Sequence, residues 1–384
     1  MAFSYLADEL EQIKQQSLYR NRRVISSSQG DKIEIGGKPV INFSSNDYLG
    51  LANHPEVIKS FKKATDKYGV GSGSAHLICG HSQSHHALEQ ELAEFTGRDR
   101  VLLFSTGYMA NMGVISALLN RGDQVFEDRL NHASLLDGGL LSGARFKRYR
   151  HNDLTDLQGK IQDKEGQSLI VTDGVFSMDG DLALLPELAK VAVDKNAWFM
   201  VDDAHGFGVL GETGGGVVEH YGLTQQQVPI LMGTLGKAFG TFGAFVAGSD
   251  VLIETLIQKA RTYIFTTAMP AAIAEATRTS LKLLAADSWR REKLNLLTLR
   301  FSLGAKQLGF QLIPSNTAIQ PILIGENQRA IDISEDLLAK GFLVSAIRPP
   351  TVPKGKSRLR ITFSANHQVQ QVDQLLNALD SISL

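Results

Sequence analysis

From residue 98 onward, short apolar runs alternate with longer segments of helical periodicity, and this alternation limits the fold more than any other feature. The runs 101–104, 169–172 and 198–202 are typical of buried strands. Strands joined by helices build a mostly parallel sheet that is flanked by helices. We therefore expect an α/β fold in which polar residues at the carboxyl ends of the strands line one ligand-binding edge.

The pattern predicts that three parts follow one another along the chain. An amphipathic helix within residues 3–18 and a hairpin within 32–43 form an N-terminal segment, residues 1–45. Residues 46–285 carry the main alternation and are expected to form a large ligand-binding domain. Residues 286–384 form a smaller C-terminal α+β domain.

The C-terminal part is expected to be reached through one long helix, residues 270–308. Strands are predicted at 319–324, 343–347 and 358–363, and helices at 327–340 and 368–381. Arg358 and Arg360 lie in the last of these strands, and we expect one of them to bind a carboxylate while the other is solvated.

Composition excludes several classes of protein. A chain of 384 residues with a formal net charge of −1 offers no bulk electrostatic attraction for nucleic acid or a membrane surface. None of its apolar runs approaches the ~20 residues of a membrane-spanning helix. Cys79 is the single cysteine, so an internal disulfide is excluded, and the first ten residues lack the pattern of a signal peptide. We expect a cytoplasmic protein.

Lys237 stands in the glycine-rich stretch 234–240, directly after the apolar run 230–232. A lysine amine becomes a nucleophile when desolvation or a nearby cation lowers its pKa. On these seven residues alone, a solvated loop lysine is the simpler interpretation. A phosphate-binding P-loop is excluded, because Leu231 replaces its first glycine and Ala238 replaces its hydroxyl residue.

Other polar residues are predicted at the same sheet edge as Lys237. Asp202 and His205 follow strand 198–202, and His132 follows strand 124–127. Gly107 and Tyr108 open a helix after strand 101–104, where free backbone N–H groups favour a phosphate. A pyridoxal phosphate enzyme requires such a set, because a lysine holds the cofactor aldehyde and an aspartate keeps the ring nitrogen protonated. The glycines around Lys237 are expected to leave room for that ring.

Two other ligand classes were weighed against the same residues. Gly206, Gly208 and Gly211 match the dinucleotide pattern Gly-x-Gly-x-x-Gly, but a poor helix start follows and the acidic residue expected ~20 positions later is missing. His81 and His85 have the i,i+4 spacing of a metal pair. No glutamate follows His81 as in zinc proteases, and Ser84 suits a helix cap, so we predict no metal site.

The sequence resembles the α-oxoamine synthases, which are fold-type I pyridoxal phosphate enzymes. The resemblance covers nearly the whole chain, in the family's order of motifs, and it looks closest to the branch of biotin biosynthesis. That branch condenses L-alanine with a pimeloyl thioester, of coenzyme A or acyl carrier protein, and releases carbon dioxide. The motifs that carry the resemblance lie at residues 44–51, 128–134, 175–181, 201–206, 234–240 and 348–353.

The resemblance implies a cofactor role for most of these residues. Lys237 would hold pyridoxal phosphate and move protons at the alanine α-carbon, and Asp202 would pair with the ring nitrogen. His205 would hydrogen-bond the ring hydroxyl oxygen, and His132 would stack on the ring. Further cofactor contacts are implied for a set that includes the two phosphate-binding positions, Gly107, Tyr108, Ser177 and Thr234.

The resemblance also implies substrate and subunit contacts. Arg20, His132 and Thr351 match substrate-contacting positions, and Arg360 matches the arginine that holds the amino-acid carboxylate. Thr266 and Thr267 match a segment that reaches the phosphate of a second subunit, which implies a homodimer with shared active sites.

Three alternatives remain open, and one of them is a dinucleotide-binding dehydrogenase, which nicotinamide binding would distinguish. A relative that uses glycine and acetyl-CoA, 2-amino-3-oxobutyrate CoA ligase, would share every cofactor residue. His76 stands where glycine-using relatives tend to have arginine, which favours alanine. A non-catalytic scaffold subunit would be expected to lack the lysine that is present at position 237.

Overall fold

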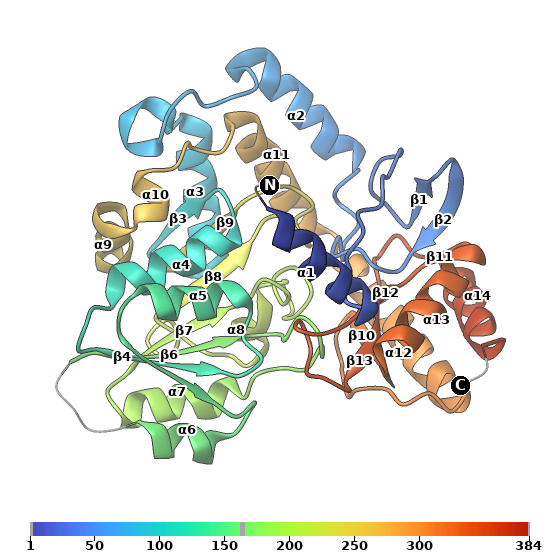
Figure 1. Ribbon diagram of the computed structural model, residues 1–384. Coiled ribbons are helices and arrows are strands. Elements are labelled where there is room, and N and C mark those ends of the chain that lie inside the picture. Colours follow the sequence, from blue (N-terminus) through green and yellow to red (C-terminus); the bar gives the residue numbers. More distant parts are fainter. Residues whose placement is uncertain (1–2, 162–165, 383–384) are drawn as a thin grey trace. The chain divides into compact units, whose positions relative to one another are not determined.

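The computed structural model describes residues 3–161 and 166–382 (Figure 1). Contacts within the chain define two compact units. Unit 1 consists of the chain up to Gly50, the short insert Met178–Asp181 and the chain from Glu292 onward. Unit 2 consists of Leu51–Ser177 and Leu182–Arg291.

A seven-stranded sheet forms the centre of the described part of unit 2, in the order β3-β9-β8-β7-β6-β4-β5. Strands β4 to β8 run parallel to one another, and β9 is antiparallel to both of its neighbours, β3 and β8. The mostly parallel α/β sheet expected from the sequence is therefore confirmed. The strands are β3 Arg100–Phe104, β4 Gln124–Asp128, β5 Arg145–Tyr149, β6 Ser168–Asp173, β7 Trp198–Asp202, β8 Ile230–Thr234 and β9 Ala244–Gly248.

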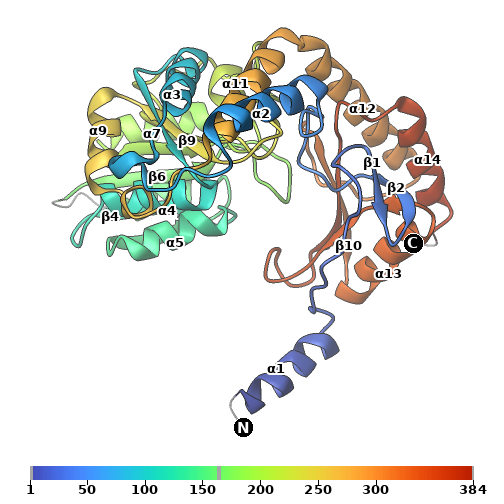
Figure 2. The same cartoon turned by 90° about the horizontal axis from the view of Figure 1, so that it is seen from above.

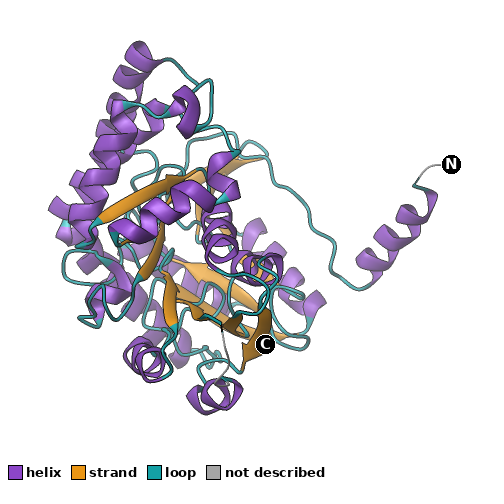
Figure 3. Cartoon of the chain, turned by 90° about the vertical axis from the view of Figure 1, so that its left-hand side faces the viewer, coloured by secondary structure: helices purple, strands orange, loops and turns teal. Residues whose placement is uncertain are grey.

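Helices cover both faces of these strands (Figure 3). On one face, Leu102, Met200 and Met232 pack with Val114 and Leu256 of two covering helices in one buried core. These side chains alternate along each strand with those of the other face, as the period of two requires. The helices of unit 2 are α2 Pro55–Tyr68, η1 His76–Gly80, α3 Gln83–Thr96, α4 Gly107–Leu118, α5 Ala133–Leu141, α6 Leu154–Lys160, α7 Leu185–Asp194, α8 Gly216–His220, α9 Asp250–Lys259, α10 Arg261–Ile264 and α11 Ala271–Ala286.

Unit 1 contains two small sheets, β1-β2-β11 and β10-β13-β12, within its described residues. Helix α1 stands at the end of an extended segment that leads to the β1-β2 hairpin (Figure 2). Next to the end of α1, this segment is anchored by Ser17 Oγ, which donates to Gln328 Oε1 at 2.6 Å. The elements are α1 Ser4–Gln15, β1 Lys32–Ile35, β2 Lys38–Asn42, α12 Ser288–Gln307, β10 Ile319–Gly325, α13 Asn327–Ala339, β11 Phe342–Leu343, β12 Ser345–Ile347, β13 Ser357–Thr362 and α14 Val369–Asp380.

Two predicted elements differ from the structure. The helix expected over 270–308 is two helices, because Asp287 leaves helical geometry with φ −96° and ψ 60°. The strand expected over 343–347 is divided between β11, which pairs with β2, and β12, which pairs with β13. The predicted helix was drawn through the polar stretch 287–293, although Asp287 and Ser288 are residue types that favour helix caps.

None of the helices within residues 3–161 and 166–382 is both long enough and apolar enough to cross a bilayer.

His367 is a fully buried titratable group of unit 1. Its Nδ1 accepts from the Ser364 amide at 3.0 Å, its Nε2 lies 3.1 Å from the Asn42 carbonyl oxygen, and its ring stacks on Phe43 at 4.4 Å. Burial lowers the pKa of His367 to about 4. The folded state therefore resists protonation that the unfolded chain, with its ordinary pKa near 6.5, accepts.

Stability should consequently fall as pH drops from 6.5 toward 4, because the unfolded chain gains a proton first. Between pH 7 and pH 5, we expect the native protein to lose about 2 kcal/mol more unfolding free energy than His367→Gln. Urea unfolding of both proteins at the two pH values measures this difference. Equal losses in the two proteins would contradict the assignment of a depressed pKa to His367.

Candidate active site

The carboxyl ends of three adjacent strands of unit 2 carry the central polar residues. Asp173 at the end of β6 is paired in register with Asp202 at the end of β7, and Asp202 is paired with Met232 of β8. The next residues of β8 end at Thr234, three positions before Lys237. Parallel register thus brings the residues predicted from strand ends to one edge of the sheet.

Lys237 and His205 are in direct contact at this edge. Lys237 Nζ lies 2.8 Å from His205 Nε2. His205 is buried, with 7% of its surface exposed, and Lys237 is half-buried. The turn that carries the lysine is closed by the Gly240 amide, which donates to the Lys237 carbonyl oxygen at 2.8 Å. The lysine is therefore half-buried and in contact with an imidazole, which contradicts the interpretation of Lys237 as a fully solvated loop residue.

Asp202 is the buried anion of this edge. Asn111 Nδ2 donates to its Oδ2 at 2.7 Å, and the Ala204 amide donates to its Oδ1 at 3.0 Å. Asn111 Nδ2 also donates to Ser134 Oγ at 2.9 Å, and Ser134 Oγ lies 2.7 Å from His132 Nδ1. A chain of hydrogen bonds therefore links the carboxylate at the end of β7 to the imidazole at the start of α5.

The charges around His132 oppose one another. Burial lowers the pKa of His132, Asp202 acts in the raising direction, and Lys237 lowers it further. The pKa of His132 is lowered by these effects together, so its imidazole is neutral near pH 7. Its backbone amide donates to Asp173 Oδ2 at 2.7 Å, and burial raises the pKa of Asp173 well above its ordinary value.

Gly107 and Tyr108 are the first two residues of α4, as the sequence predicts. The Thr106 side chain caps this helix by accepting from the Met109 amide at 3.2 Å. The amides of residues 107 and 108 precede the helical hydrogen-bond ladder and belong to the positive end of the helix. The Tyr108 ring meets the His132 ring edge-on, with centroids 6.1 Å apart, and its hydroxyl donates to Asp137.

The remaining predicted residues of unit 2 occupy turns and connecting segments. Thr234 Oγ1 donates to the Gly243 carbonyl oxygen at 3.1 Å and accepts from the Gly236 amide at 3.4 Å. Ser177 is half-buried directly before the insert of unit 1. Thr267 forms an isolated bridge with Ala75, its carbonyl oxygen accepts from Ser105 Oγ at 3.2 Å, and Thr266 precedes it.

The glycines of the dinucleotide-like stretch have packing roles. A Cβ on Gly206 would lie 2.0 Å from Asp203 Oδ1, and one on Gly211 would lie 2.0 Å from Glu219 Oε2. Asp203 is fully buried and its Oδ2 accepts from the Val217 amide at 2.7 Å. Two of the three glycines of the pattern therefore make room for carboxylates that fold the loop, and their presence needs no nucleotide.

Three residues that were predicted to contact substrate belong to unit 1, namely Arg360, Arg20 and Thr351. Arg360 is buried and its Nη2 donates to Asn46 Oδ1 at 3.2 Å. Arg358 is buried as well and pairs with Asp179. The expectation that one of these two arginines is solvated is therefore wrong, because residues two apart in a strand share a face.

Arg20 and Thr351 both line one cavity of about 270 Å³ in unit 1. Arg23 and Arg348 line it too, so three guanidinium groups gather around it. Arg348 is held by its donation to the Ser17 and Tyr19 carbonyl oxygens, and burial together with Arg20 lowers its pKa. This concentration of positive charge suits an anionic ligand.

Sequence reasoning missed three residues that organise the edge, Asn111, Ser134 and Asp173. The available signal for Asn111 was a polar amide inside the otherwise apolar helix at 110–115. Ser134 lay within a noted motif but was assigned nothing. Asp173 was not considered, because the strand was predicted to end at residue 172, although the Asp173 carboxylate fixes the backbone of His132.

The residues present fit a pyridoxal phosphate cofactor. An ionised carboxylate can accept about four hydrogen bonds, and Asp202 accepts two in this structure, so it can receive a ring N–H. Lys237 supplies the amine, and the start of α4 supplies amides for a phosphate. All of these groups belong to one sheet edge of unit 2.

Comparisons with known proteins agree with this fit. The family described as aminotransferase class I and II matches residues 38–379. The chain is 61% identical to an 8-amino-7-oxononanoate synthase of Thioalkalivibrio sulfidiphilus over 98% of this chain and 96% of the relative. It is 62% identical to the protein of the same name from Methylococcus capsulatus over 97% of each chain.

Two solved structures are also similar to this chain. A serine palmitoyltransferase of S. paucimobilis, with a bound PLP-myriocin aldimine, has a TM-score of 0.93 at 32% identity and covers 99% of this chain and 96% of its own. An 8-amino-7-oxononanoate synthase of Francisella tularensis has a TM-score of 0.79 at 33% identity over 89% of this chain and 97% of its own.

The turn that carries Lys237 can be tested with two glycines. Gly240 has φ +66°, and its Cβ would lie 2.4 Å from the Ala52 amide nitrogen, so Gly240→Ala should destabilise the protein by more than about 2 kcal/mol. Gly236 has nothing closer than 3.7 Å, so Gly236→Ala should change stability by less than about 1 kcal/mol. Equal unfolding midpoints for the two variants would refute this account.

Proposed function

Since the chain belongs to the aminotransferase class I and II family, and within it to the α-oxoamine synthases, we propose that it makes 8-amino-7-oxononanoate in biotin biosynthesis. The reaction condenses L-alanine with a pimeloyl thioester and releases carbon dioxide and the free thiol. The observation that carries the proposal is the Lys237–His205 contact beside buried Asp202 at one sheet edge, in a chain about 60% identical to synthases of that name.

Pyridoxal phosphate, when bound, supplies an aldehyde that joins to amines and a protonated ring that accepts the electron pair left by a departing proton or carboxylate. Asp202 would hold the ring nitrogen in its protonated form, because a buried carboxylate stabilises a neighbouring positive charge. Asn111 and the Ala204 amide fix the two carboxylate oxygens, so the anion keeps one orientation. The start of α4 would bind the phosphate through the amides of Gly107 and Tyr108.

Lys237 would hold the cofactor and afterwards carry the proton of the alanine α-carbon. An amine serves as a base only when it is unprotonated, and the imidazole of His205, 2.8 Å away, can share its proton. His205 would also bind the ring hydroxyl oxygen. His132, neutral and held through Ser134, would present a flat ring face for stacking. Ser177, Thr234, Thr266 and Thr267 complete the proposed cofactor contacts.

The substrate contacts are proposed for unit 1. Arg360, held beside Asn46 and Tyr48, would bind the alanine carboxylate through its guanidinium. The cavity lined by Arg20, Arg348 and Thr351 would bind an anionic part of the pimeloyl thioester. We propose that the protein acts in the cytoplasm, which agrees with its single, free cysteine.

Product analysis tests the proposed reaction. The holoenzyme is given equal concentrations of alanine and glycine together with pimeloyl-CoA, pimeloyl-acyl carrier protein and acetyl-CoA, and the products are identified by mass spectrometry. We expect the product of alanine and a pimeloyl thioester to predominate. Alanine labelled with ¹³C at the carboxyl carbon should give an unlabelled product, whereas label at the methyl carbon should be retained.

Lys237→Ala is the matched control and should form no product. A predominant product of glycine and acetyl-CoA would instead assign the chain to the 2-amino-3-oxobutyrate CoA ligases. Full turnover by Lys237→Ala, or bound cofactor without any turnover by the native chain, would contradict the proposed role of Lys237.

We propose a homodimer in which Thr266 and Thr267 reach the phosphate of a second subunit. Large apolar side chains are exposed on the segments that flank the Ala75–Thr267 bridge, with Ile78 78% and Phe265 70% exposed. Exposed apolar groups on adjoining segments are typical of a surface that another protein covers.

The dimer can be tested by charging this surface. Ile78→Asp and Phe265→Asp should weaken self-association, because a buried carboxylate without a partner is costly. Val251→Asp is the control, since Val251 is 77% exposed on α9, away from that bridge in the sequence. Light scattering across a dilution series should show monomers for the first two variants only. A native protein that remains monomeric at all concentrations would refute the dimer.

A further inference from the structure

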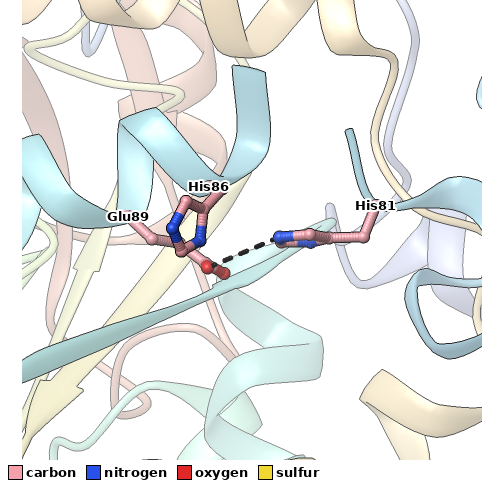
Figure 4. A group of neighbouring side chains, drawn as sticks. All are labelled: His81, His86 and Glu89. Carbon is pink, nitrogen blue, oxygen red and sulfur yellow. Dashed lines mark ion pairs between the residues drawn. The ribbon is translucent and has the colours of Figure 1, made fainter. Parts of the chain in front are cut away.

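A histidine and carboxylate cluster lies at the start of α3, apart in sequence from every residue assigned to the cofactor. His81 precedes the helix, and His86 and Glu89 lie one turn apart on it. One ring nitrogen of each histidine and one carboxylate oxygen of Glu89 all lie within 4.8 Å of one another. Figure 4 shows the three side chains turned toward a common point. We propose that His81, His86 and Glu89 form a binding site for a divalent transition-metal ion such as Zn²⁺.

The separations suit such an ion. Zinc binds imidazole nitrogen and carboxylate oxygen at about 2.0–2.2 Å, which places neighbouring ligand atoms about 3.3 Å apart. His81 Nε2 and Glu89 Oε2 are 3.9 Å apart, which is too long for a hydrogen bond but close to the spacing of two ligands. Small rotations of the side chains would bring the three atoms to coordination distance.

Contacts around the cluster orient His81 and Glu89 for metal binding. His81 Nδ1 is 3.0 Å from His76 Nδ1. If the proton of the His81 ring is on Nδ1 and is shared with His76, His81 Nε2 keeps its lone pair for a metal ion. Histidines that bind metals are usually oriented by such a bond at the second nitrogen. Glu89 Oε1 accepts from the Leu103 amide at 3.1 Å, which fixes the carboxylate while Oε2 faces the histidines.

The cluster differs from the pair considered from the sequence, His81 and His85. His85 Nδ1 accepts from the Ser82 amide at 3.0 Å and closes a capping box, and its Nε2 lies 2.7 Å from the Met269 carbonyl oxygen. Both ring nitrogens of His85 therefore make contacts that stabilise the fold. The N-cap of the helix is Ser82 rather than the predicted Ser84. The i,i+3 spacing of residues 86 and 89 places the second histidine and the carboxylate on one helix face instead.

The chemistry of the ligands selects the class of ion. Two imidazoles and a carboxylate suit Zn²⁺, Ni²⁺, Co²⁺ or Cu²⁺, whereas Mg²⁺ and Ca²⁺ prefer oxygen ligands. His86 and Glu89 also line a cavity of about 600 Å³, through which water can complete the coordination. The cation Arg100 acts on Glu89, but its guanidinium is engaged by Asp250 and Glu254. A bound ion would tie the segment 76–81 to α3.

The test is a Zn²⁺ titration of the holoenzyme after treatment with a chelator, followed by calorimetry. We expect saturable binding of one ion per chain, and a visible absorption spectrum of bound Co²⁺ when that ion replaces zinc. His86→Gln and Glu89→Gln should each weaken binding by more than about 100-fold, because each removes a ligand rather than a residue that orients one. Their turnover without added metal should stay at the native level.

Two control variants separate this site from adventitious binding. His220→Gln removes an exposed histidine elsewhere in unit 2, and Cys79→Ser removes the thiol of the neighbouring turn, so both should bind like the native chain. The proposal is overturned by the absence of saturable binding to the native chain, by native affinity in both ligand variants, or by loss of binding in Cys79→Ser.

Discussion

The buried carboxylate of Asp202 is the constraint on which the active-site edge depends. A charge with 4% exposure is costly unless hydrogen-bond donors surround it. Asn111 and the Ala204 amide supply two donors, and the same Asn111 amide continues through Ser134 to His132. The need to satisfy one anion therefore also positions the imidazole of a different strand-to-helix connection, and both groups belong to the proposed cofactor site.

The next residue, Asp203, shows how an adjacent acid can serve the fold instead. Its side chain points to the opposite side of the chain, where it accepts from the Val217 amide and is packed against Gly206. Burial raises the pKa of Asp203 well above its ordinary value, whereas a carboxylate that is to pair with a ring nitrogen must remain ionised. Two neighbouring aspartates thus have different tasks because only one of them faces the sheet edge that carries Lys237.

Much of this edge could be predicted from the sequence, because strand ends are marked by apolar runs and parallel strands bring their ends together. Asn111 could not be assigned, since its role depends on which helix face packs against β7. The glycines near Lys237 were expected to make room for a ring, yet Gly240 serves a left-handed turn against Ala52, and Gly233 makes room for the rings of Phe207 and Phe245. The grouping of His86 and Glu89 with His81 was also missed, because the i,i+4 spacing of the histidines in the sequence pointed to His85 instead.

The account rests on Lys237 as the residue that holds the cofactor. Reduction of the holoenzyme with borohydride makes that attachment permanent, and peptide mass mapping then identifies the modified side chain. We predict a single pyridoxyl phosphate addition on the peptide that contains Lys237, with none on Lys195 or Lys259 of the same unit. Addition to a different lysine, or an unmodified Lys237 in protein that contains the cofactor and is active, would contradict the account.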